Sequence, residues 1–294
     1  MKVGVQAWGP EDAVTGLLGG RDGHRVGTVE QRRFPIDTGM LGLNLSFSCD
    51  TVADGFFSPR HRHCWDQLRF VLDGSLSIGQ TDLEPGDCCY FPEAVSYGPQ
   101  EQSGEATVLV LQFTGAGGLY YPTTDELAAA RDRLRRAGGI FEGGRYKGRG
   151  LDGTPVDQDG YEALWEAHTG CKLVYVRPRY GGVVIMRSAS YEWLADQRHP
   201  GIDVKPLGCF TEHQTTVTLV RIAPGAHTDG RKLTAPQVRY VLSGTVLLSG
   251  TAVLGERQYP PGSCFWMPAG GPSQPLASLT GAELFAVSLP RYAP

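Results

Sequence analysis

The sequence predicts an all-β protein made of two tandem barrels, and three observations carry this prediction. A long segment of the chain is repeated, the repeated parts contain short alternating strand patterns, and Gly and Pro are abundant, at 40 and 20 of 294 residues. Gly and Pro together make up about a fifth of the chain, against an average of roughly 12 %. Many short strands with Gly and Pro corners are typical of closed or double-sheet barrels.

The repeat relates the two ends of the chain. The segment QLRFVLDG at 67–74 returns as QVRYVLSG at 237–244, an offset of 170 residues, and PGDCCYFP at 85–92 returns as PGSCFWMP at 261–268, an offset of 176. The second copy therefore carries six extra residues between the two blocks, which we place in a longer loop within 247–260. A repeat of this length with strand patterns indicates a duplicated β domain rather than a solenoid.

Within each copy, runs that alternate apolar with small or polar residues predict half-buried strands, separated by Pro-Gly steps. The predicted strands are 41–48, 68–72, 88–91 and 107–113 in the first copy, and 215–222, 238–248, 264–267 and 284–289 in the second.

The segment between the copies has a helical pattern instead. TTDE at 123–126 is a capping box followed by apolar residues on one helical face, so we expect a helix there. A Gly-rich linker at 138–153 leads to a second short helix at 161–168, with Gly170 beyond its end. The predicted parts of the chain are an N-terminal barrel at 1–121, a short helical Gly-rich connector at 122–170 and a C-terminal barrel at 171–294.

Composition excludes several classes of protein. The formal charge is −4, without the basic excess of a nucleic-acid binder, and 41 % hydrophobic residues suffice to form a core. The apolar runs are too short to cross a membrane, and the start of the chain has no secretion signal. Seven cysteines without a CxxC pair indicate reduced, mostly buried thiols. We therefore expect a cytoplasmic protein.

One segment carries a recognisable motif. Residues 55–74 contain Gly55, the pair His61-x-His63, Gln67 and Gly74, and residues 86–97 contain Gly86 and Pro92. These spacings resemble the two sequence motifs of the cupin superfamily, whose first motif is Gly, five residues, His-x-His, three residues, Glu, six residues, Gly. Together with the repeat, the resemblance implies a bicupin, two cupin barrels of the double-stranded β-helix or jelly-roll type in tandem.

The resemblance also implies a metal centre in the first barrel. Residues i and i+2 of a strand point to the same face, so His61 and His63 are expected to present two imidazoles to one point. Imidazole with an oxygen ligand suits Fe, Mn, Ni, Cu or Zn. Cupins most often hold iron, so the expected cofactor is a divalent metal, Fe(II) first, with Zn, Mn, Ni or Cu as alternatives.

Two positions depart from the cupin pattern, and their roles stay open. Gln67 stands where the motif has Glu, and it is either a third ligand or half of a buried pair with Arg69 that stabilises the barrel. Tyr97 stands where the motif has His, and it is a ligand, a hydrogen-bond donor beside the ligands or an aromatic wall. Asp66 or Glu93 would be an alternative carboxylate ligand, although we expect Asp66 in an exposed turn and Glu93 in a loop.

The second copy departs from the pattern at every ligand position. The equivalent residues are Arg231, Leu233, Gln237 and Ser273. We therefore predict that the second barrel binds no catalytic metal and has a structural role.

The resemblance implies a function, because dioxygenases are the most frequent class among cupins with a His-x-His site. We expect a metal-dependent enzyme, of the dioxygenase type, that acts on a small anionic or enolisable molecule, with Tyr97 in proton transfer or orientation and Arg69 pairing with an anionic group. A non-redox cyclase, isomerase or lyase, similar to cupin polyketide cyclases, and a non-catalytic metabolite-binding bicupin are the alternatives. The expected partner is a small-molecule substrate, with neither nucleic acid nor membrane, and a homodimer is an open possibility.

Overall fold

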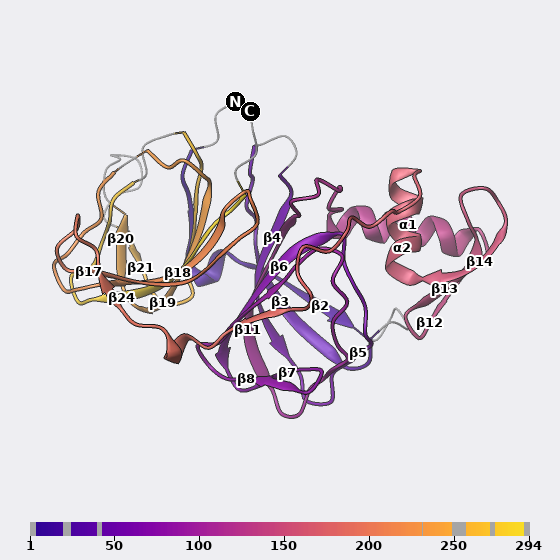
Figure 1. Ribbon diagram of the computed structural model, residues 1–294, viewed down its shortest axis with the longest axis horizontal. Helices are drawn as coiled ribbons and strands as arrows, with labels where there is room; N and C mark the ends of the chain where they lie inside the picture. Colours follow the sequence, from indigo (N-terminus) through magenta and orange to yellow (C-terminus); the bar gives the residue numbers. More distant parts are fainter. Residues whose placement is uncertain are drawn as a thin grey trace.

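The computed structural model describes residues 4–19, 25–39, 43–230, 232–248, 257–270 and 274–290. Two β barrels lie next to each other, and a small helical unit lies on the far side of the first barrel (Figure 1). None of the helices in these ranges is long and apolar enough to cross a membrane.

Each barrel is built on a seven-stranded antiparallel sheet. The first sheet has the order β15 (Val184–Met186), β9 (Cys88–Phe91), β6 (Trp65–Asp73), β11 (Ala106–Thr114), β4 (Leu45–Val52), β3 (Thr28–Phe34) and β2 (Val14–Gly19). The second has the order β1 (Gln6–Trp8), β22 (Cys264–Met267), β19 (Gln237–Gly244), β24 (Ala282–Ser288), β18 (Thr215–Ile222), β17 (Ile202–Phe210) and β16 (Leu194–Ala195).

Short strands complete the barrels. They are β5 (Phe57–Ser58) with β10 (Gln100–Glu101), β7 (Leu76–Ile78) with β8 (Thr81–Leu83), and β20 (Val246–Leu248) between β21 (Gln258–Tyr259) and β23 (Leu276–Ala277). The predicted strands are therefore confirmed, with shifts of their ends, except that the segment predicted as one strand at 238–248 forms two strands, β19 and β20, in different sheets. Part of the predicted strand at 41–48 and most of the longer loop at 247–260 lie outside the described residues.

The two barrels exchange their first strands. β1, at the start of the chain, pairs with β22 of the second barrel, where Trp8 lies opposite Cys264. β15, which begins the second copy, pairs with β9 of the first barrel, where Met186 lies opposite Cys88. The repeat thus includes the first strand of each copy. Each of these strands belongs to the sheet of the other copy.

The faces that the two sheets turn toward each other form one shared core. This cluster contains Phe47, Phe70 and Tyr90 from the first sheet with Trp266 and Phe285 from the second, and it continues through neighbouring apolar residues. Burying one large apolar side chain contributes about 1.5–3 kcal/mol, so the shared core binds the barrels firmly to each other. Each barrel also has an apolar cluster of its own on the opposite face of its sheet.

A repeated glycine shows why the motif residues are needed for the fold. Gly74 directly follows β6 and Gly244 is the last residue of β19, and both have positive φ, at 71° and 72°. A Cβ atom there would lie 2.2 Å from the Glu105 carbonyl oxygen and 2.0 Å from the Gly281 carbonyl oxygen. Only glycine allows this turn to pass so close to the neighbouring backbone.

The connector contains both predicted helices. α1 (Thr124–Arg136) begins at the capping box of Thr123 and Glu126, and α2 (Gly160–Thr169) ends at Gly170 with φ 71°. The prediction of a linker at 138–153 is wrong, because this segment supplies most of a three-stranded sheet. Its strands are β12 (Ile140–Glu142), β13 (Arg145–Arg149) and β14 (Pro155–Asp159). Antiparallel ladders satisfy the backbone of the glycine-rich segment. Two 3-10 turns, Pro10–Asp12 and Ser188–Ser190, complete the part of the chain that the structure describes.

The cysteines agree with the prediction of reduced thiols. All seven are free, and five of them are buried.

Asp66 differs from its prediction, because it is a buried residue of β6 and not an exposed turn residue. Its side chain is 1 % exposed, and Oδ1 accepts a hydrogen bond of 2.8 Å from the backbone N–H of Glu93. Glu93 accepts hydrogen bonds from the Gly117 N–H and from Arg179. Burial raises the pKa of Asp66 to about 7, and the hydrogen bond from Glu93 offsets part of this rise.

This raised pKa predicts a pH dependence of stability. The folded-state pKa of Asp66 lies above the unfolded value of about 3.9, so its contribution is complete below that value and is lost as pH rises through about 7. We expect Asp66→Asn to gain stability over wild type by about 1.4 kcal/mol per pH unit between pH 4 and pH 7. Urea unfolding across this range measures the difference. The exposed Glu101→Gln is the control, and a pH-independent difference for Asp66→Asn would contradict the assignment.

Candidate active site in the first barrel

Backbone pairing brings the two motif segments together. His61 donates its backbone N–H to the Tyr97 carbonyl at 3.1 Å, and Tyr97 donates its own to the His61 carbonyl at 2.9 Å. The Ala94 N–H donates to the His63 carbonyl at 2.7 Å. The histidines of the first motif and the tyrosine of the second therefore lie side by side.

The three side chains face one another. The ring centroid of His61 lies 4.8 Å from that of His63 and 4.6 Å from that of Tyr97. The Tyr97 hydroxyl lies 3.4 Å from the ring nitrogens of His63. His63 and Tyr97 are 6 % and 5 % exposed, and His61 is half-buried. The structure thus brings together three of the predicted site residues in a nearly dry environment.

A backbone carbonyl determines the tautomer of His61. Its Nδ1 lies 2.6 Å from the Pro59 carbonyl oxygen, which only accepts hydrogen bonds, so Nδ1 carries the proton. The lone pair of a neutral His61 ring is then on Nε2. This arrangement, in which one ring nitrogen donates to a carbonyl, is common for histidines that bind metals.

Gln67 is held by its neighbours. With its amide oxygen turned toward Arg69, Gln67 accepts from Nε and Nη2 of that guanidinium at 2.8 and 3.1 Å. In this orientation the Gln67 side-chain nitrogen lies 2.7 Å from the side-chain amide of Gln112, on β11. Gln237 has equivalent bonds in the second copy, from Arg239 at 3.0 and 2.7 Å and to Ser288 at 3.0 Å. Because the second copy has no paired histidines, these bonds account for the glutamine without a metal, and a ligand role for Gln67 stays a prediction.

Arg69 makes the site cationic. Its guanidinium donates to Gln100 at 2.8 Å and lies over the Phe91 and Tyr97 rings, 4.8 and 5.8 Å from their centroids. Burial raises the pKa of the Tyr97 phenol, although the positive charges of Arg69 and Arg25 oppose this rise, so the phenol stays protonated at neutral pH.

Two charged residues near the site lie outside the sequence motifs. Arg25 acts electrostatically on both Tyr97 and Asp50. Asp50 is buried on β4, where desolvation raises its pKa to about 6 and hydrogen bonds from Ser48 and Gln31 lower it. The sequence signal for Asp50 comes from the repeat. The equivalent residue of the second copy, at the offset of 170, is the apolar Val220.

The connector closes one side of the site. The His63 ring stacks on Trp65 with centroids 4.0 Å apart and planes at 9°. Tyr161 of α2 meets Trp65 edge-on at 4.7 Å, and its centroid lies 6.1 Å from that of His63. These rings belong to an apolar cluster, which therefore shields the histidines from that side. Sequence analysis missed Tyr161 because it lies about 100 residues away in a helix without a motif.

The alternative carboxylate ligands are engaged elsewhere. Asp66 and Glu93 form the bonds given above, and the described ranges contain no cluster of three or more His, Cys, Asp or Glu side chains suited to a metal. In the second barrel, Leu233 and Gln237 occupy ligand positions, whereas Arg231 and Ser273 lie outside the described residues.

Known structures resemble this chain over its whole length. A "putative dioxygenase" from Nostoc punctiforme has a TM-score of 0.65 at 14 % identity, covering 99 % of this chain and 87 % of that one. Protein YlbA from E. coli has a TM-score of 0.58 at 12 % identity, covering 99 % and 93 %. A point mutant of oxalate decarboxylase from Bacillus subtilis has a TM-score of 0.55 at 15 % identity, covering 100 % and 79 %. Another structure of that decarboxylase concerns its Mn(II) centres.

No protein-family model and no curated protein matches the sequence. The similar structures are cupin-family proteins, and at these identities the likeness establishes the fold. The chain is therefore a bicupin in its fold, an all-β protein of two tandem cupin barrels.

Proposed function

We propose that the first barrel is the active site of a metal-dependent enzyme, a dioxygenase-type oxidoreductase that acts on a small anionic or enolisable molecule. The observation that carries this proposal is the convergence of His61, His63 and Tyr97 inside the barrel. The structural likeness to a "putative dioxygenase" and to a decarboxylase supports an enzyme of this fold.

The donor set fits a divalent metal held mainly by nitrogen. His61 and His63 would hold the ion, with the Tyr97 oxygen or the Gln67 amide as further donors. The Pro59 carbonyl, which orients the His61 ring, supports this assignment. Such ligands suit Fe, Zn, Mn, Ni or Cu, and Fe(II) comes first because the cupins that this chain resembles most often hold iron. When bound, the ion supplies Lewis acidity toward a substrate oxyanion and, if it is iron, electrons for the activation of oxygen.

The charges around the site favour an anionic substrate. Arg69 and Arg25 bring two positive charges into the first barrel. Both lower the pKa of the buried Asp50 carboxyl electrostatically. No ion pair within 4.0 Å joins Arg69 to an acid among the described residues. A carboxylate, enolate or phenolate would therefore gain a charge-assisted hydrogen bond from Arg69.

Tyr97 is suited to hold the proton of the reaction. Its hydroxyl is protonated at neutral pH and lies at the edge of the His63 ring, so it would donate to an oxyanion of a substrate bound beside the histidines. The Trp65 and Tyr161 rings exclude water from this side, and hydrogen bonds gain strength in such surroundings.

A non-redox reaction is the second candidate. Gln67 replaces the acidic motif residue, and Asp66 and Glu93 are engaged elsewhere, so the donor set has no carboxylate. A metal in such a site keeps most of its positive charge and favours Lewis-acid chemistry, as in a cyclase, isomerase or lyase.

The first prediction from this proposed function concerns metal content. Wild-type protein purified without a polyhistidine tag is expected to contain about one divalent metal ion per chain, and His61→Ala/His63→Ala is expected to lose at least about tenfold of it. Elemental analysis by mass spectrometry measures both. His227→Ala, at an exposed position of the second barrel, is the matched control. Wild type without metal under metal-replete conditions would instead support a non-catalytic metabolite-binding protein.

The second prediction separates the two candidate reactions. With a panel of small enolisable carboxylates and phenols, we expect oxygen uptake that depends on both substrate and metal. An oxygen electrode follows uptake while chromatography follows product. Product formed at the same rate without oxygen would contradict the dioxygenase proposal and favour the Lewis-acid reaction.

The third prediction concerns the roles of Arg69 and Tyr97. Arg69→Gln is expected to raise KM for an anionic substrate roughly tenfold, because a charge-assisted hydrogen bond is lost. Tyr97→Phe is expected to lower kcat by about 10²-fold or more, because the proton donor is lost. Steady-state kinetics give both constants, with Arg221→Gln on the second barrel as control. Unchanged KM in Arg69→Gln would exclude its role in substrate binding.

A further inference from the structure

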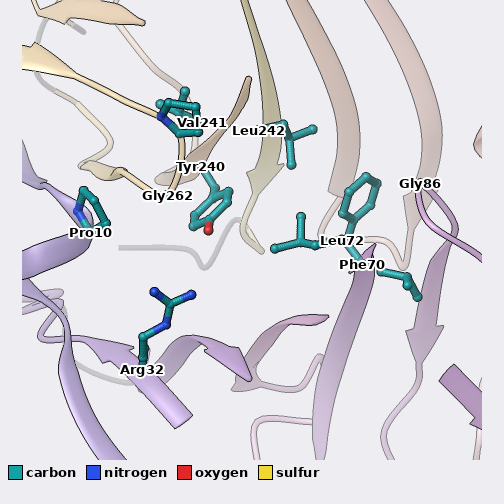
Figure 2. Close-up of a pocket in the computed structure, with 11 residues that line it drawn as sticks. Pro10, Arg32, Phe70, Leu72, Gly86, Tyr240, Val241, Leu242 and Gly262 are labelled. Carbon is teal, nitrogen blue, oxygen red and sulfur yellow. The ribbon is translucent and has the colours of Figure 1, made fainter. Parts of the chain in front are cut away.

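A cavity of about 440 Å³ lies between the two barrels, away from the histidines. Figure 2 shows the Tyr240 hydroxyl turned toward the Arg32 guanidinium, with Pro10 on one side and Phe70 on the other. The residues that line it are Pro10, Arg32, Phe70, Val71, Leu72, Gly86, Tyr240, Val241, Leu242, Pro261 and Gly262. Its size falls within the range of pockets for small molecules.

The lining comes from equivalent parts of the two copies. The offsets of 170 and 176 relate Phe70 to Tyr240 and Gly86 to Gly262. The contacts of these glycines correspond as well, because a Cβ on Gly262 would meet Pro10 at 3.1 Å and one on Gly86 would meet Ser188 at 3.0 Å. The cavity therefore lies where the copies face each other, and differences between the copies give it its character.

The copies differ most beside the exchanged strands. The offset of 178 that relates Pro10 to Ser188 also relates Ala13 to Tyr191, and the strand registers relate Arg32 to Lys205. On the second-copy side, Lys205 Nζ donates to the Ser188 carbonyl at 3.0 Å and lies 5.0 Å from the Trp193 ring centroid. On the first-copy side, the small Ala13 stands at the position of Tyr191. It lines a void behind the cavity.

Arg32 has no carboxylate partner in this space. Its Nη2 lies 3.4 Å from Cys49 Sγ, and no ion pair of Arg32 occurs among the described residues. Burial raises the pKa of the Cys49 thiol, so the sulfur is neutral at neutral pH and the charge of Arg32 is not balanced by it. The exposed Glu30, two residues earlier on β3, acts on Arg32 only at a distance.

We propose that this cavity is a second binding site, for a small monocarboxylate with an apolar body. The Arg32 guanidinium would bind the carboxylate through paired hydrogen bonds, and the Tyr240 hydroxyl would donate a further one. The Phe70, Leu72 and Leu242 side chains would cover the apolar part. This site is independent of the metal site and of the reaction proposed for it.

Titration calorimetry of the full chain with benzoate tests the proposal. We expect saturable binding to wild type, at least about tenfold weaker binding of the neutral isostere benzamide, and a similar loss for Arg32→Gln. Ala13→Tyr, which introduces the residue of the second copy, is expected to block the cavity without removing the charge. Tyr240→Phe, which introduces the residue of the first copy, should weaken binding about threefold or more.

The control is His61→Ala/His63→Ala, in which this binding should be unchanged. The proposal would be overturned by the absence of saturable benzoate binding to wild type, by benzoate affinities of Arg32→Gln and Ala13→Tyr that both equal the wild-type affinity, or by loss of all binding in the histidine double variant. Equal affinity for benzoate and benzamide would also overturn it, because the guanidinium would then have no part in recognition.

Discussion

The packing of the two seven-stranded sheets against each other is the interaction on which the rest of the structure depends. It buries large side chains of both copies, such as Phe47, Tyr90 and Trp266, in one core. The exchange of β1 and β15 adds backbone hydrogen bonds between the copies. Neither barrel could keep its edge strand if the other were removed, so the copies are expected to fold as one unit. This constraint requires large apolar residues on the shared face and leaves the barrel interiors free to differ.

The interior of the first barrel contains polar residues where the interior of the second contains apolar ones. Strand register relates Gln31 and Asp50 of the first barrel to Val204 and Val220 of the second, which belong to its apolar cluster. Both copies nevertheless retain the glutamine–arginine pair on β6 and β19. The pair therefore belongs to the architecture, whereas the surrounding charges and the histidines distinguish the first barrel. The larger number of polar groups in the first barrel agrees with the proposal that places the chemistry there.

The connector adds the side of the site that neither barrel supplies. Tyr161 of α2 packs on Trp65, and Trp165 of the same helix donates from Nε1 to the Tyr120 carbonyl at 2.8 Å, which ties the helix to the first barrel. Arg62, between the two histidines, lies 3.8 Å from the Tyr175 ring centroid and 3.5 Å from Glu162. A movement of the connector would therefore displace residues that contact the segment containing the two histidines.

The sequence by itself determined the all-β class, the duplication, both helices and the convergence of His61 and His63, because strand alternation and motif spacing are local properties of the chain. It left the roles of Gln67 and Tyr97 open. Only the tertiary structure decided that Asp66 is buried, that the first strands are exchanged and that a helix covers the histidines. Each of these depends on which distant segments meet, and pairing between distant segments leaves no periodic pattern in a single sequence.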